Sequence, residues 1–358
     1  MQWKRFAPWL IPVIPAVGIK IFSFFPDAVE KYYSSGLYPF VVRLLRITFG
    51  WIPFSVGDVF YAVIFVYMLM AIVRFIKRGF QRRLYREYLF YCAGQLVSSV
   101  LWVYVVFNFL WGLNYDRPDI DDQLHLESRP YDKDELEHLL STIVLRMNNL
   151  DSASHASRSD LKKRIFREST DAYRIYAAND DAFYYRTPSV KPTLFGYLGD
   201  YLGFSGYYNP FTGEAQVNTT VPVFVQPFTT CHEIGHQLGY AKEEEANFAG
   251  YLAAKSSPDP AFRYSAYLDL YLYAGTELYL LDSASYIPYR ESLNPGVRQD
   301  LRDLKEFNKK YENPFEPIIR ILYGDYLKAN RQPQGMNSYD EVVGLAIAYY
   351  KKFGPEAF

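Results

Sequence analysis

The sequence predicts an α+β protein that is mainly helical, with three N-terminal transmembrane helices followed by a soluble domain that holds a small β-sheet. Every stretch that is apolar and long enough to cross a hydrocarbon core of about 30 Å falls before residue 114. Helical periodicity dominates the remainder, apart from an aromatic and β-branched stretch at 191–225. We therefore divide the chain into a membrane domain, residues 1–113, and a soluble domain, residues 114–358.

Composition narrows the class of protein. Half of the 358 residues are hydrophobic and 18% are aromatic, which excludes a disordered chain. Two cysteines cannot build a disulfide framework or a cysteine-rich zinc module. The net charge of -1 conceals an asymmetry, because residues 1–113 hold 12 Lys and Arg against 4 Asp and Glu. The two parts of the chain are therefore expected in different surroundings.

Three stretches predict the membrane spans. Residues 88–113 are the clearest, with no formal charge from Leu89 onward, and residues 56–76 are almost as apolar. Residues 6–25 contain Lys20 and three prolines. We interpret this third stretch as a span rather than a signal peptide, because no small-residue cleavage site follows it and further spans come after it.

Positive charge predicts the orientation and the partners of these spans. The connection between the second and third spans carries five Lys and Arg residues within 77–86, and Lys4 and Arg5 precede the first span. Such clusters favour the cytoplasmic side, so the N-terminus is expected in the cytoplasm and the C-terminal domain on the far side, in a periplasm or its equivalent. Membrane topology explains a short basic loop between two spans, so this loop does not indicate nucleic-acid binding. The expected partner of the spans is the lipid bilayer.

In the soluble domain, amphipathic helices are expected in the order in which their periodicity and start signals occur. The stretch at 191–225 predicts a small sheet with a hairpin, in which AQVNTTV offers an edge for an extended peptide. The expected helices are 132–150, 158–178, 228–239, 243–256, 260–284, 295–311, 315–330 and 338–353.

One segment, PFTTCHEIGHQLGYAKEEEANFAGYLA at 227–253, carries candidate chemistry. His232 and His236 lie four residues apart, so on a helix both imidazoles project from one face and can bind one Zn²⁺. Glu233 lies between them, where it would act as the general base toward a metal-activated water and later protonate the leaving amine. The segment therefore predicts a zinc-dependent hydrolase.

The third zinc ligand is expected among three consecutive glutamates. It is not another histidine from further along, because His236 is the last histidine in the chain. Glu243 is favoured, since it falls in the first turn of the next predicted helix and shares its face with a small residue and an amide. Glu245 is the alternative. The remaining glutamates would complement the helix dipole.

Other polar residues are weaker candidates. Four tyrosines that we do not separate could stabilise a transition state, namely Tyr207, Tyr208, Tyr271 and Tyr273. Cys231 adjoins the motif but points away from its face on a helix, so a buried apolar role is expected. Three histidines are expected at the surface, namely His125, His138 and His155.

The order of these features is familiar. Three early spans, WGLNYDRP, GYYNPFTGEAQVN and HEIGHQLGYAKEEEANFAGYL together resemble a bacterial family of multi-pass membrane proteins described only as a domain of unknown function. The resemblance covers nearly the whole chain and implies a zincin-like metallopeptidase core on the extracytoplasmic side. More distantly, HExxH followed by ExxA and Asn is similar to the gluzincin pattern of HtpX-type and CAAX-prenyl membrane proteases. That similarity implies His232, His236 and Glu243 as ligands and Glu233 as base.

The leading hypothesis is a membrane-anchored zinc metallopeptidase of the HExxH type, which hydrolyses peptide bonds of a peptide or protein substrate outside the cytoplasm. The alternative hypothesis is a cell-envelope sensor or scaffold in which zinc stabilises the fold without peptidase activity. Glu233→Gln separates the two hypotheses, because only a peptidase requires that carboxylate.

Overall fold

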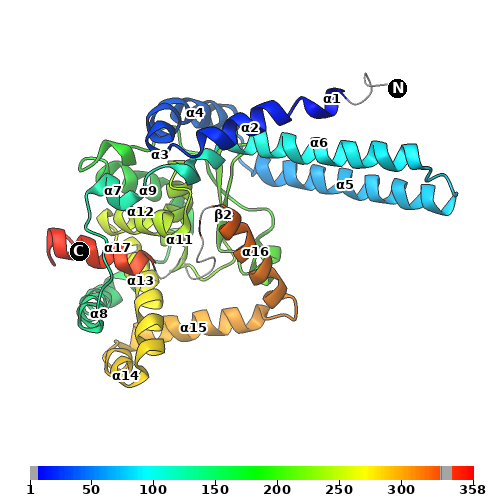
Figure 1. Cartoon of the computed structure of the whole chain (residues 1–358). Coiled ribbons are helices and arrows are strands. Elements are labelled where there is room, and N and C mark those ends of the chain that lie inside the picture. The colour runs from blue at the N-terminus through cyan, green and yellow to red at the C-terminus, as the bar shows by residue number, and fades with distance from the viewer. Residues whose placement is uncertain (1–6, 331, 333–340) are drawn as a thin grey trace.

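Helices dominate the structure because apolar residues recur at helical spacing through most of the soluble half. The structure, a computed structural model, describes residues 7–330, 332 and 341–358. Figure 1 shows a globular part built from helices around a small sheet, with a long helical hairpin projecting from it. The mainly helical α+β class is therefore confirmed.

The hairpin consists of α5 (Val56–Phe80) and α6 (Arg86–Leu110), which are both long and apolar enough to cross a membrane. Most of their large apolar side chains are exposed, as expected of a lipid-facing surface. Figure 1 shows the two helices side by side, with their connection at the end far from the globular part.

The first predicted span, residues 6–25, is not a continuous helix in its described part. It is divided into α1 (Ala7–Leu10) and α2 (Val13–Phe22), and Pro12 lies at the break. Ten residues of helix rise only about 15 Å, half of a hydrocarbon core. The structure therefore supports two of the three expected spans, because proline interrupts the hydrogen bonding that a continuous span needs.

A connecting region links α2 to the hairpin and packs into the globular part. It contains α3 (Pro26–Ala28), the π-helical turn η2 (Val29–Leu37) and α4 (Tyr38–Phe49). Buried side chains of this region, including Tyr33, Tyr38 and Val42, form a small core with Trp111 and Tyr208. This core joins the segments on both sides of the hairpin.

The remaining elements of the globular part follow the hairpin. The second, larger core lies mainly between α8, α9, α11, α12, α13 and α17. After the 3₁₀ turn η3 (Gly112–Asp116) the helices are α7 (Ile120–Leu124), α8 (Lys133–Ala156), α9 (Leu161–Tyr176), α10 (Gly196–Leu202), α11 (Gln226–Gln237), α12 (Glu243–Ser256), α13 (Pro260–Leu281), α14 (Ser283–Glu291), α15 (Pro295–Tyr311), α16 (Glu316–Ala329) and α17 (Glu341–Phe353), with a 3₁₀ turn η4 (Asp181–Phe183) after α9.

The sheet has three strands, β1 (Val190–Pro192), β2 (Gly206–Asn209) and β3 (Glu214–Val217), in the order β1-β3-β2. β1 is parallel to β3, whereas β2 is antiparallel to it with Tyr208 opposite Ala215. The expectation that AQVNTTV offers the free edge is wrong, because β3 lies in the middle and both of its sides are paired. β2 is an edge strand instead.

Buried polar contacts fix the base of the hairpin to this sheet. Glu214 of β3 accepts hydrogen bonds from the backbone N–H groups of Val56 and Gly57 at 3.2 and 2.6 Å, so it caps α5. Asp58 is fully buried and accepts hydrogen bonds from the Leu194 N–H at 2.6 Å and from the Tyr207 hydroxyl. The first turn of α5 is thereby tied to the strands beside the candidate site.

Candidate metal centre

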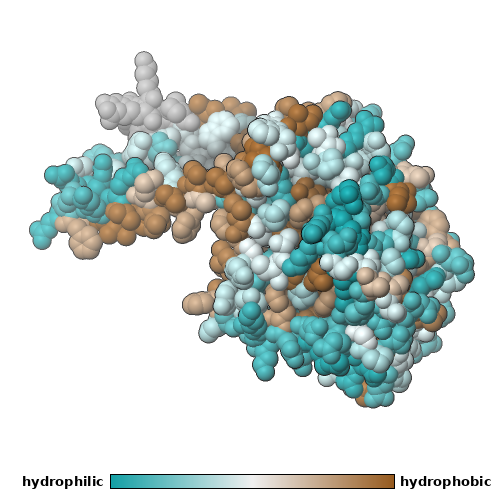
Figure 2. All heavy atoms as spheres, turned by 180° about the vertical axis from the view of Figure 1, so that it is seen from behind, coloured by the Kyte–Doolittle hydropathy of each residue, from teal (hydrophilic) through white to brown (hydrophobic). Residues whose placement is uncertain are grey.

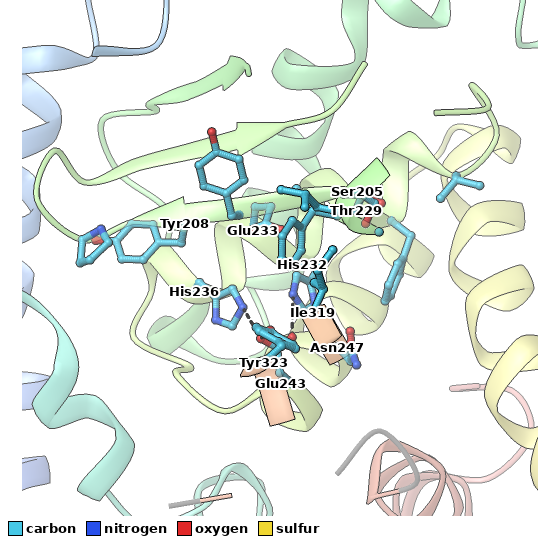
Figure 3. Close-up of a pocket in the computed structure, with 18 of the residues that line it drawn as sticks. Ser205, Tyr208, Thr229, His232, Glu233, His236, Glu243, Asn247, Ile319 and Tyr323 are labelled. Carbon is cyan, nitrogen blue, oxygen red and sulfur yellow. Dashed lines mark hydrogen bonds and ion pairs between the residues drawn. The ribbon is translucent and has the colours of Figure 1, made fainter. Parts of the chain in front are cut away.

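The helix α11 places the HExxH residues at the edge of a cavity. His232 and His236 lie one turn apart, and their ring centroids are 4.7 Å from each other. Ligand atoms of His232, Glu233 and His236 all lie within 4.8 Å of one another. Figure 3 shows both imidazoles turned toward the same point in the cavity.

A tight turn then brings Glu243 to this point. Gly239 has a φ of +94°, a left-handed conformation that ends α11 at little cost, and α12 begins four residues later. The Glu243 carboxylate lies 3.4 Å from Nε2 of His232 and 3.7 Å from Nε2 of His236. Two histidine nitrogens and one carboxylate therefore converge, which matches the donor set of a catalytic zinc site.

Close packing between α11 and α12 depends on a second glycine. A Cβ atom at Gly250 would lie only 2.8 Å from the backbone nitrogen of His232. Any side chain at this position would separate the two helices. The small residue therefore keeps Glu243 within reach of the histidines.

The electrostatics of the three residues reflect their proximity. Burial raises the pKa of Glu243, but a hydrogen bond with His232 and the charges of both histidines outweigh it and lower this pKa to about 2. Burial lowers the pKa of His232, but Glu243 and Glu233 outweigh it and raise the pKa to about 9. Burial lowers the pKa of His236 to about 4. These shifts favour a protonated His232, a neutral His236 and an ionised Glu243 at neutral pH.

Glu233 faces the same cavity and has a distinct environment. It is 3% exposed, and its Oε2 has no hydrogen-bond partner within the described parts of the chain. Burial raises its pKa to about 8. A Cβ atom at Gly206 would lie 2.6 Å from its Oε1, so the glycine in β2 leaves room for this carboxylate. A buried carboxylate with a free oxygen is suited to accept a proton from a reactant.

Outer contacts orient the ligands. Nδ1 of His236 lies 2.7 Å from the carbonyl oxygen of Tyr240, and the Trp111 indole donates to the carbonyl of His236 at 2.9 Å. The Tyr323 hydroxyl donates to Glu243 at 2.7 Å. These contacts leave Nε2 of His236 and one oxygen of Glu243 directed at the shared point.

Asp269 of α13 is a site residue that the sequence reasoning missed. It lines the same cavity, and burial raises its pKa to about 8 while the charge of His232 lowers it. Nδ1 of His232 and Oδ2 of Asp269 both lack a hydrogen-bond partner among the described residues. A carboxylate behind a zinc-binding histidine is a common outer contact. Trp111 and Tyr323 were missed too, since only tertiary packing brings them here.

The structure separates the candidates that the sequence left open. Glu245 does not face the histidines, because its carboxylate accepts a hydrogen bond from the Ile120 N–H at 3.2 Å. Glu244 accepts a hydrogen bond from Gln332 at 2.6 Å. Among the glutamates at 243–245, only Glu243 lines the cavity.

The tyrosine candidates also divide. Tyr273 lines the cavity near Asn247, with 3.5 Å between its hydroxyl and the amide nitrogen, and Tyr207 and Tyr208 line it from β2. Tyr271 bonds to Tyr286 instead, outside the cavity. Cys231 is fully buried, as expected. The cavity lining does not include His125, His138 or His155.

The cavity has a volume of about 660 Å³, enough for several residues of a peptide. Its walls come from distant parts of the chain: the base of the hairpin with Tyr61 and Phe107, the edge strand β2, and α16 with Ile319 and Tyr323. The candidate centre therefore opens beside the base of the helical hairpin.

Comparison with known proteins identifies a family but no function. The family model described as Protein of unknown function (DUF3810) matches residues 33–347. No curated protein and no solved structure matches the chain. The expected family of unknown function is confirmed, whereas the distant relationship to HtpX-type and CAAX-prenyl proteases has no support. The chemistry of the site has to be argued from its own residues.

Proposed function

The chain belongs to the DUF3810 family, and from its site we propose that it is a membrane-anchored zinc-dependent metallopeptidase acting on the extracytoplasmic side of a bacterial inner membrane. The observation that carries the proposal is the convergence of His232, His236 and Glu243 beside Glu233, whose buried oxygen has no partner among the described residues. This donor set fits zinc, and the adjacent carboxylate fits a general base.

The residues divide the chemistry between them. His232, His236 and Glu243 would hold the ion. A zinc ion there supplies Lewis-acid activation of a water molecule and of the substrate carbonyl. Glu233 takes one proton from the attacking water as the new C–O bond forms. It then delivers that proton to the amide nitrogen, so that the C–N bond breaks and a neutral amine leaves.

The edge strand β2 supports a peptide as substrate. Its residues Gly206 to Tyr208 line the cavity next to Glu233, and β3 pairs with only one of its two sides. An extended peptide can add to such an edge through main-chain hydrogen bonds. This pairing would position a peptide bond in front of the Glu233 carboxylate.

The hairpin supports the proposed location. Lys77 and Arg78 lie in the last turn of α5, and Arg82, Arg83 and Arg86 follow at the tip of the hairpin, where α5 connects to α6. If this basic tip is cytoplasmic, two crossings leave the globular part on the opposite side. We retain the N-terminal segment as a third, proline-broken crossing with a cytoplasmic N-terminus, because α1 and α2 pack against α6.

Exposed apolar side chains suggest that substrates lie near the membrane. α10 and α16 pack together beside the cavity, and Figure 2 shows apolar side chains on the face next to the hairpin. A bilayer around the hairpin would meet this face. We therefore propose juxtamembrane segments as substrates. The exposed residues are Tyr197, Leu198 and Tyr201 around α10 and Phe315, Ile318, Ile321 and Leu322 around α16.

The test is the zinc content of the full chain purified in detergent, compared with its variants. Wild type, Glu233→Gln and Glu245→Ala are expected to hold about one zinc, whereas His232→Ala and Glu243→Ala lose it. A peptide library then tests hydrolysis by wild type and Glu233→Gln. Absence of zinc from wild type contradicts the proposal. Zinc with no hydrolysis, and an intact biological function in Glu233→Gln, favours the scaffold alternative.

A further inference from the structure

A second cavity lies at the C-terminal end of α11 and is rich in arginine. Its volume is about 580 Å³. Four arginines line it, and Asp181 is the only carboxylate among its described lining residues. The arginines are Arg43 and Arg46 of α4, Arg117 after η3, and Arg186 after η4. Its excess of fixed positive charge contrasts with the metal centre.

Arg46 is the central feature, because it is buried without a negative partner. The residue is 5% exposed, and its Nη1 has no hydrogen-bond partner in the described chain. Its guanidinium lies 5.0 Å from the ring centroid of Tyr185, and its Nε lies 3.4 Å from the carbonyl oxygen of Val42. No carboxylate lies within ion-pair distance among the residues that the structure describes. Burying a charge in this way is costly.

Arginine cannot escape this cost by losing its proton, since its pKa stays above the physiological range. Lys255 shows the contrast, because burial lowers its pKa to about 7 and it can become neutral. The carbonyls at the end of α11 do not hold Arg46 either. Among the described residues, the side-chain donor to the carbonyl of Gln237 is Tyr38, at 2.9 Å, and the side-chain donor to that of His236 is Trp111.

Two further arginines of this cavity are available for a ligand. Arg43 and Arg186 are exposed, and neither has a carboxylate partner in the described part of the chain. The Cζ atom of Arg186 lies 4.7 Å from the ring centroid of Tyr184, and this stacking orients the plane of the guanidinium group. Arg117 differs, because it pairs with Glu30 at 2.8 Å. Three guanidinium groups therefore remain around one cavity without an ionic partner.

We propose that this arginine cavity binds a phosphate group. Guanidinium planes match phosphate oxygens through paired, charge-assisted hydrogen bonds, and several of them together favour a multiply charged oxyanion. The group could come from free phosphate or from the headgroup of an anionic phospholipid. The second source fits α4, where Phe40, Leu44 and Ile47 are 74%, 65% and 54% exposed beside Arg43. This proposal does not depend on the metal centre.

The experiment uses the full chain in phosphatidylcholine nanodiscs. One arm measures the melting temperature against inorganic phosphate, with chloride at equal ionic strength as the reference. The other arm adds phosphatidylglycerol to the nanodiscs and measures retained phospholipid by native mass spectrometry. The test variant is Arg43→Gln with Arg186→Gln, and the matched control is Arg167→Gln with Arg174→Gln, two arginines of α9 whose side chains are 74% and 68% exposed.

We expect a ligand-dependent signal in wild type and in the control, and binding about tenfold weaker or worse in the test variant. A signal from phosphate alone identifies the free anion, and one from phosphatidylglycerol alone identifies the headgroup. Arg46→Met is expected to abolish the signal while keeping the melting temperature of the ligand-free protein. If neither ligand gives a signal, or if the signal survives both the double variant and Arg46→Met, the proposal is overturned.

Discussion

Two cavities of opposite character meet α11, one along the helix and one at its C-terminal end. In the first cavity, two histidines and the carboxylates of Glu233 and Glu243 can gain or lose protons, and burial shifts the pKa of each. In the second cavity, Arg46 and the neighbouring guanidinium groups carry a fixed positive charge. The first set is suited to bind a cation and to move a proton. The second set is suited only to hold an anion, so chemistry is expected in the first cavity and ligand binding in the second.

The largest expected effect tests whether the cavity that contains the two histidines is catalytic. Glu233→Gln keeps the shape of the side chain but removes the base, so kcat/KM for a peptide substrate should fall by ~10²–10⁴-fold. Zinc content should stay at that of wild type, because Glu233 is not one of the proposed ligands. Steady-state kinetics and metal analysis on the same preparation check both statements. Activity close to wild type would contradict the role of Glu233.

The next effect separates two neighbouring glutamates of α12. Glu243→Gln removes a proposed ligand, so zinc affinity should fall by more than the ~10–100-fold that loss of an outer contact costs. Glu245→Gln is the matched control, because its carboxylate binds the Ile120 N–H and not the histidines. Competition with a zinc chelator gives both affinities. Equal losses in the two variants would show that charge alone, and not position, determines binding.

An intermediate effect is expected at Asp269, which lines the same cavity as His232 and interacts with it electrostatically. Asp269→Asn should weaken zinc binding by ~10–100-fold, because the amide cannot support the imidazole as a carboxylate does. Asp200→Asn is a suitable control, since Asp200 is a buried aspartate that bonds to Asn218 and Thr220 and does not line the cavity. Zinc affinity is again the measurement. An unchanged affinity in Asp269→Asn would assign this residue to the cavity wall alone.

Much of the fold could be predicted because its signals are local. The expected helices 243–256 and 295–311 have the observed bounds, since both begin at clear start signals and carry regular apolar spacing. The convergence of His232, Glu233, His236 and Glu243 was also predictable, because three of these residues fall on adjacent turns of α11 and the fourth follows one short turn. The first span was not, since proline divides a stretch whose overall hydropathy suggests one helix.

The remaining features depend on contacts between distant segments. β2 could be recognised as an edge strand, and β3 as the central strand, only once the pairing of the strands was known. Asp269 and His232 line the same cavity only because α13 packs on α11. Arg46, Arg117 and Arg186 belong to three separate segments, and nothing in their local sequence indicates that they share a cavity. Single-sequence patterns carry no information on such neighbours.

The smallest expected effect concerns Lys255 of α12 and its contribution to the pH dependence of stability. Burial, reinforced by the charge of Arg146, lowers the pKa of Lys255 to about 7, whereas an unfolded lysine has a pKa near ~10.4. Between these values the unfolded chain holds a proton that the folded chain has released, so the contribution of Lys255 makes stability rise with pH from about 7 to about 10.

Lys255→Met should therefore flatten the pH dependence of the melting temperature in this interval. The melting temperature of the variant should exceed that of wild type most near pH ~7 and below. Lys309→Met, which replaces an exposed lysine of α15, is the control and should follow wild type. Arg46→Met offers the direct comparison, because a guanidinium keeps its charge and should add no such slope. A wild-type slope that survives in Lys255→Met would mean that other groups titrate in this interval and that Lys255 keeps its charge when the chain folds.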